Sequence, residues 1–158
     1  MMEPYPTPET VTDWDDASLL ATTGCASAIR YHEHGFASLN PTERLHCCFN
    51  LLESCINNGG VGHWIESICP LSAPATVSAL CDIDADEMAK FVTNALLPMG
   101  DINSIRSKDA WAAHYLAIPD TVHEQWETQT AAYLDLEPKF LTLAYAYARR
   151  TWHHVRAA

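Results

Sequence analysis

Apolar side chains recur every three or four residues along most of the chain, and nowhere do they alternate with polar ones as in a strand. The clearest apolar stripe comprises Leu45, Cys48, Phe49, Leu52 and Ile56. Before it, Asn40 suits a helix cap, Pro41 suits the first helical position, and Glu43 completes a capping box. The sequence therefore predicts an amphipathic helix that begins at Pro41.

The tetrapeptide Asn57-Asn58-Gly59-Gly60 follows this stripe directly. Asn tolerates the left-handed backbone conformation and Gly adopts it without a steric penalty, so the tetrapeptide predicts a helix end and a sharp reversal. A short helix from Val61 to about Ile68 is expected next, with Trp64 turned inward. Replacement of either Asn is expected to impair folding first.

Six further helices are predicted from the same spacing and from Pro, Gly and capping residues. They cover approximately 14–32, 74–80, 84–97, 109–117, 120–134 and 138–155. Asp84 is expected to cap one of them with Glu87 in a second capping box, and Pro138 is expected to begin the last.

The first dozen residues contain three prolines and are expected to form a flexible N-terminal arm, residues 1–12. Residues 13–158 are expected to form an all-helical domain. The predicted fold is therefore all-α, a single compact domain of about seven or eight helices.

Charge is unevenly distributed along the 158 residues, whose formal net charge is −11. Residues 109–138 contain no Lys or Arg, and their acidic side chains are Asp109, Asp120, Glu124, Glu127, Asp135 and Glu137. Residues 139–158 contain no acid and four basic side chains, Lys139, Arg149, Arg150 and Arg156. The net field disfavours direct binding to nucleic acid or an anionic membrane and favours a basic protein partner. Negative charge that merely keeps the protein in solution is the alternative.

The sequence contains no recognisable catalytic or metal-binding motif. Its six cysteines include no C-x-x-C pair, and its eight histidines lack ligands at helical spacing, so no metal, cofactor or catalytic residue is expected. The cysteines from Cys47 to Cys81 are interpreted as small buried apolar residues. No apolar run reaches the roughly 18 residues of a membrane span, and no secretion signal is recognised. A cytoplasmic location is expected.

Several segments carry a resemblance when they are taken in order. They are Leu39-Asn40-Pro41-Thr42-Glu43-Arg44, then Asn57-Asn58-Gly59-Gly60 with Trp64, then 73–80 with Ile83-Asp84-Ala85, and last Tyr133-Leu134-Asp135 with Phe140. Together they resemble a bacterial family of unknown biochemical function that includes a nineteen-kilodalton DNA-mimic protein, over about residues 39–155. The chain departs from the family pattern at Cys55, usually acidic, at Val61, commonly aromatic, and at Asp84, typically Gly.

The resemblance implies a function through surface charge. Carboxylates would imitate DNA phosphates and occupy the nucleic-acid site of a DNA-binding protein such as a transcriptional repressor. The candidate partner-binding residues are the six acids of 109–138, although Asp120 also suits a helix cap, and Asp135 and Glu137 also suit a helix start. The resemblance also suggests a homodimer, for which the basic last helix offers a contact.

Two alternatives remain open. An immunity protein that neutralises a toxin, such as a nuclease with a basic groove, would use the same electrostatics. A small hydrolase would instead need a pocket in which Glu53, Asn58 and His63 converge.

Overall fold

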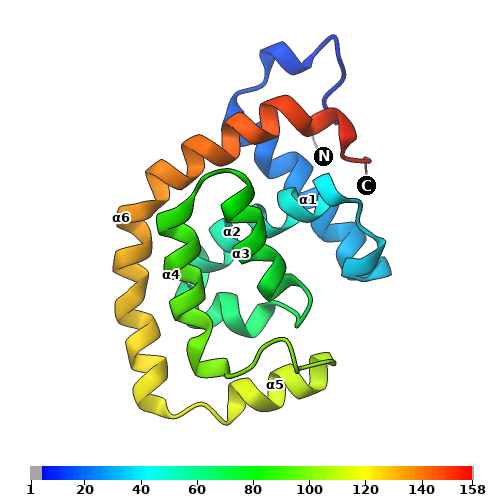
Figure 1. Ribbon diagram of the computed structural model, residues 1–158. Helices are drawn as coiled ribbons and strands as arrows, with labels where there is room; N and C mark the ends of the chain where they lie inside the picture. The colour runs from blue at the N-terminus through cyan, green and yellow to red at the C-terminus, as the bar shows by residue number, and fades with distance from the viewer. Residues whose placement is uncertain (1–4, 158) are drawn as a thin grey trace.

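Six α-helices and four short 3-10 helices make up the fold, and no strand occurs in residues 5–157, the part that the computed structural model describes (Figure 1). The α-helices are α1 (Asp16–His34), α2 (Pro41–Ser67), α3 (Ser72–Asp82), α4 (Asp86–Leu96), α5 (Lys108–Leu116) and α6 (Asp120–Thr151). The 3-10 helices are η1 (Val11–Asp13), η2 (Phe36–Ser38), η3 (Leu97–Met99) and η4 (Trp152–His154). The prediction of an all-α fold in one domain is confirmed.

Two of the predicted helix boundaries lie inside longer helices. Gly60 has φ 80° and ψ −179°, so α2 consists of two helical segments joined by a kink, and the predicted break at the tetrapeptide with a second helical segment after it is confirmed. Pro138 lies inside α6. Tyr133 and Phe140, one on each side of it, are buried on the same stripe, and this packing holds the helix together across the proline. The prediction that Pro138 begins a helix was wrong. Because α2 keeps one label across its kink and α6 continues through Pro138, the eight predicted helices correspond to six labelled α-helices.

The expected capping box at Asp84 was also wrong, because α4 begins at Asp86 and no side chain caps it. Asp84 instead terminates α3 with a left-handed φ of 60°. The Ala85 N–H donates to the Leu80 carbonyl at 2.9 Å, and the Asp84 N–H donates to the Cys81 carbonyl at 3.1 Å. This pair of bonds is a Schellman motif with Asp84 at the residue that usually is Gly.

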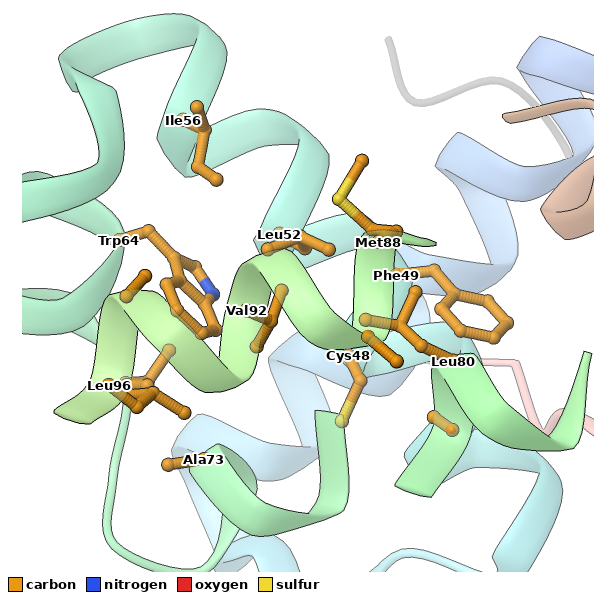
Figure 2. Close-up of a cluster of buried hydrophobic side chains, with 14 of the residues drawn as sticks. Cys48, Phe49, Leu52, Ile56, Trp64, Ala73, Leu80, Met88, Val92 and Leu96 are labelled. Atoms are coloured by element: carbon orange, nitrogen blue, oxygen red, sulfur yellow. The ribbon is translucent and has the colours of Figure 1, made fainter. Parts of the chain in front are cut away.

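The first half of α2 is the central element of the core, as Figure 2 shows. Its buried side chains include Cys48, Phe49 and Leu52, which lie beside Val92 of α4 and Leu80 of α3. Cys47 and Cys48 are buried, as expected. Cys55 and Cys69 are only half-buried and Cys81 is exposed, so the expectation of burial was wrong for Cys81.

Two buried tryptophans fix the later helices to this core. The Trp111 indole N–H of α5 donates to the Ile65 carbonyl at 2.8 Å, and that of Trp126 in α6 donates to the Ala95 carbonyl at 3.0 Å. Buried indole N–H groups usually find an acceptor, and these two bonds help to set the positions of α5 and α6.

The N-terminal segment contacts the end of α6 and the residues after it. The Tyr5 hydroxyl donates to the Val155 carbonyl at 2.8 Å, and the Arg149 guanidinium donates to the carbonyls of Val11 and Trp14. The flexibility expected of residues 1–12 stays a prediction, and residues 1–4 lie outside the described residues.

Candidate partner-binding surface

Helix α6 follows one edge of the molecule as a long arc (Figure 1). Its 32 residues extend about 48 Å at the usual helical rise. Trp126, Tyr133 and Phe140 line its inner side and are at most 1% exposed. Long helices curve with their convex side toward solvent, so the outer side of α6 is a convex surface.

Four of the six candidate acids lie on this outer side. Asp120, Glu124, Glu127 and Asp135 are exposed, and at 3.6 residues per turn they fall within a sector of about 80° that avoids Trp126 and Tyr133. They cover about 22 Å of the helix axis. We call these four residues the acidic face of α6. Asp120 is the first helical residue and Pro119 occupies the cap position, so the alternative role of Asp120 as a cap was wrong.

The other two candidates lie elsewhere. Asp109 is exposed in the first turn of α5, a helix that Ser107 caps. Glu137 is half-buried and turned toward α2, where its carboxylate accepts a hydrogen bond from the Asn57 side chain at 2.6 Å. Neither Asp135 nor Glu137 flanks a helix start, because α6 continues through both.

Among the residues that the structure describes, none of the six candidate acids forms an ion pair. The basic C-terminal segment, in contrast, pairs mostly within the chain. Lys139 pairs with Glu87, Arg149 with Asp16 and Arg156 with Glu43. These pairs use most of the positive charge that a dimer contact would need, and the homodimer stays a prediction.

The pair between Arg156 and Glu43 is the most buried of these contacts, since the Glu43 side chain is fully buried. The capping box is confirmed, because the Asn40 N–H donates to Glu43 and the Glu43 N–H donates to the Asn40 side chain, each at 2.9 Å. Burial alone would raise the pKa of Glu43, but hydrogen bonds from Arg156 and Asn40 outweigh it and hold the pKa at about 2. One carboxylate thus joins the start of α2 to the C-terminal segment.

The Asn57-Asn58-Gly59-Gly60 tetrapeptide lies where α2 crosses α6. The Asn58 side chain donates to the Ser54 carbonyl at 2.7 Å. The Val61 N–H, which the kink at Gly60 frees from the helix, donates to the Thr130 hydroxyl of α6 at 3.2 Å. Sequence reasoning did not identify Thr130 because it lies 69 residues away.

A sequence profile of the DMP19-like protein family matches residues 37–151. The chain belongs to this family. The match runs from the residues before α2 to the end of α6, so it contains both the tetrapeptide and the acidic face. It confirms the resemblance found from the sequence. No curated protein and no solved structure matches the chain.

The hydrolase alternative requires three side chains that this DMP19-like chain places in different surroundings. Glu53 accepts a hydrogen bond from Asn57 at 3.2 Å, Asn58 bonds backbone, and His63 is exposed. No hydrogen bond joins any two of the three within the described part of the chain.

His46 and Cys47 are adjacent in sequence, and both are fully buried in the core of this DMP19-like chain. His46 is fully buried between the hydroxyls of Thr23, at 2.7 Å from Nδ1, and Thr151, at 2.9 Å from Nε2. Burial lowers the pKa of His46 to about 4 and raises that of the Cys47 thiol. A thiol with a raised pKa is a poor nucleophile, so Cys47 does not suit catalysis. The hydrogen bonds of His46 to Thr23 and Thr151 instead link α2 to α1 and α6.

No helix within residues 5–157 is both long enough and apolar enough to cross a membrane.

Proposed function

We propose that this protein is a non-enzymatic acidic binding protein that inhibits a DNA-binding protein by occupying its nucleic-acid site. The single observation that supports this function is the acidic face of α6, whose four carboxylates have no basic partner within the described chain. The buried side chains of Trp126, Tyr133 and Phe140 hold the other side of the same helix. The charges therefore stand on a rigid, convex support.

The electrostatic logic follows from how proteins bind DNA. A DNA-binding surface presents Lys and Arg to a line of phosphates that carries one charge about every 3.4 Å along each strand. Helical rise places Glu124, Glu127 and Asp135 about 6, 10 and 22 Å from Asp120 along the axis of α6. This sparser line of charge can meet several of the same cations. Because the contact is between exposed charges, it should weaken strongly as salt rises.

The test begins with affinity capture from the lysate of the native host at about 0.1 M salt and again at about 0.5 M. The captured protein is then purified, and its binding is measured with and without duplex DNA. We expect a basic DNA-binding protein that high salt releases and that DNA displaces. A Glu124→Gln, Glu127→Gln double variant should weaken binding at least tenfold.

The matched control is Glu66→Gln, which removes an exposed carboxylate from α2 without touching the acidic face. It should leave the affinity within about twofold. A partner that binds the double variant as tightly as the native protein would refute the proposal. Recovery of a toxin whose substrate groove is basic would instead establish the immunity alternative.

A further inference from the structure

A mainly apolar groove runs between α3 and α4, which lie side by side in Figure 1. Two adjoining hollows of about 530 and 300 Å³ form it, and Val77 of α3 and Thr93 of α4 line both of them. Ala89 lines the first hollow. Pro74, near the start of α3, and Leu97, just after α4, line the second, so the two helices are antiparallel.

The groove lies on the side of α4 that is turned away from α6. Phe91 marks the opposite side, because its ring lies 6.1 Å from that of Tyr133 in α6. At 3.6 residues per turn, Ala89 and Thr93 each lie about 160° around the axis of α4 from Phe91. A segment bound in the groove would therefore occupy a different surface from the acidic face of α6.

The end of the groove near the start of α3 leaves large apolar side chains in solvent. Leu97 is 65% exposed, and Leu71, about one turn before Pro74, is 56% exposed. Most other large apolar side chains of the described chain are covered. Exposed leucines beside an apolar hollow form the kind of patch that marks a protein-binding surface.

The opposite end, at the turn from α3 to α4, is acidic. Asp82, Asp84 and Asp86 are exposed there, and none of them forms an ion pair within residues 5–157. Asp86 also lines the first hollow, and Lys90 is the one base of the described chain that lines either hollow. The groove thus changes from acidic at one end to apolar at the other.

We propose that this groove docks an amphipathic helix of a protein partner. The apolar stripe of that helix lies between α3 and α4, and Lys or Arg side chains in its last turn lie beside Asp82, Asp84 and Asp86. Apolar helix faces bind in hydrophobic grooves of this kind, and cations in a last turn also suit the helix dipole. From Asp86 to Leu97 the groove follows about 16 Å of α4, so it fits about three helical turns.

A second copy of this chain suits the groove less well. Its helices bury their apolar sides in its own core. Lys139, Arg149 and Arg156, three of the four bases in residues 139–158, already pair within the chain. A second copy therefore offers few free cations to the acidic end. The inference does not rest on the proposed function, because it uses a different surface.

The experiment uses the full chain labelled with ¹⁵N, and its probe is a synthetic peptide about four helical turns long. The peptide is acetylated and amidated, carries Leu and Ala on one stripe, and has Arg in its last turn. A scrambled peptide of the same composition keeps the charge but loses the stripe, so it measures general attraction to an acidic protein. At about 0.15 M NaCl we expect saturable NMR shifts at Val77, Thr93 and Leu97, and at least tenfold weaker binding of the scrambled peptide.

Thr93→Arg places a long cationic side chain in the groove at an exposed position, and it should weaken binding of the peptide at least tenfold. Thr128→Arg is the matched control, because Thr128 is also exposed and its hydroxyl, like that of Thr93, donates to the carbonyl four residues earlier. This control should leave the affinity within about twofold. The thermal midpoint of each variant is measured in parallel. Equal binding by Thr93→Arg and the native protein would overturn the inference.

A pair of double variants tests the charge at the acidic end. Asp82→Asn with Asp86→Asn should weaken binding of the peptide at least threefold, whereas Glu124→Gln with Glu127→Gln removes equal charge from α6 and should change it less than twofold. Equal losses in both double variants would overturn the inference, because the attraction would then come from the net charge of the whole molecule.

Two further outcomes separate this inference from its rivals. A native dimer that Thr93→Arg converts to a monomer in light scattering would overturn it, because a second copy would then cover the groove. If the amphipathic peptide fails to bind while the Glu124→Gln, Glu127→Gln variant still loses its DNA-binding partner, the groove is refuted as a docking site and the proposed function stands.

Discussion

At the scale of single residues, Asp84 occupies a backbone position that favours glycine. Its φ of 60° is the one left-handed value of a non-glycine residue in the described chain. The Schellman bonds at the end of α3 require this conformation, and the family pattern typically has Gly here. Asp tolerates the left-handed region better than most residues but still at some cost.

Replacement of Asp84 by Gly should therefore stabilise the protein by up to about 1 kcal/mol, measured as the free energy of unfolding in urea. Asp86→Gly is the matched control, because it removes the same charge from the first turn of α4. This control should destabilise by about 1 kcal/mol. Equal losses in both variants would show that the Asp84 side chain contributes more than its backbone conformation costs.

Two buried ionisable residues should make stability depend on pH. His46, with a pKa of about 4, is neutral in the fold, whereas the unfolded chain binds a proton below about 6.5. Its contribution is complete above pH 6.5 and is lost as pH falls toward 4. Glu43, with a pKa of about 2, contributes fully above about 4.5 and loses its contribution as pH falls toward 2.

Unfolding free energy should thus fall by about 3 kcal/mol between pH 7 and pH 4 through His46, followed by a further fall through Glu43. Urea unfolding at a series of pH values measures both. The variant His46→Gln removes the titrating group and should flatten the curve between pH 6.5 and 4.5. An unchanged slope in this variant would assign the pH dependence to other groups.

At the scale of elements, the crossing of α2 and α6 depends on the kink at Gly60. A Cβ atom there would lie 2.9 Å from the Thr130 hydroxyl oxygen, and the φ of 80° is strained for any residue with a side chain. The same hydroxyl accepts the Val61 N–H. Close contact and backbone conformation thus both require glycine.

Gly60→Ala should destabilise the protein by about 2–3 kcal/mol, measured by urea or thermal unfolding. Gly62→Ala provides the control in the same helix. Its Cβ would meet Trp126 at an ordinary 3.6 Å, and its backbone is helical, so this change should be neutral or stabilising by up to about 1 kcal/mol. A similar loss in both variants would contradict the importance of the kink.

Local sequence signals predicted where helices begin and where they could end, but they did not predict which of the possible ends interrupt a helix in the fold. The capping box at Asn40 was correct because its partners are three residues apart. Gly60 does break the helical geometry, and Thr130 accepts the N–H that the break frees, whereas Pro138 does not separate helices, because buried side chains continue across it. Such compensation comes from residues distant in sequence, which helical periodicity does not reveal.

The candidate site shows the same division. Helical spacing and charge identified exposed acids such as Glu124 and Glu127. They could not show that Glu137 bonds Asn57, 80 residues away, or that Arg149 pairs with Asp16. Whether a charge is free or paired depends on tertiary contacts.

At the scale of the whole molecule, a net charge of −11 with many unpaired carboxylates creates self-repulsion. Added salt should therefore raise the thermal midpoint as it screens this repulsion, for example between about 0.01 and 0.5 M NaCl. The triple variant Glu124→Gln, Glu127→Gln, Asp135→Asn should unfold at the same or a higher temperature and respond less to salt. A markedly lower midpoint would show that the acidic face is needed for folding.

The hydrogen bond between Tyr5 and Val155 makes the chain suitable for circular permutation. It brings the two ends of the described chain together beside the C-terminal end of α6, far from Asp120 at the other end of that helix (Figure 1). A short Gly-Ser linker could join the termini, and new ends could be opened in residues 101–107, between η3 and α5. Such a circular permutant would keep all six helices intact while its new ends emerge near α5.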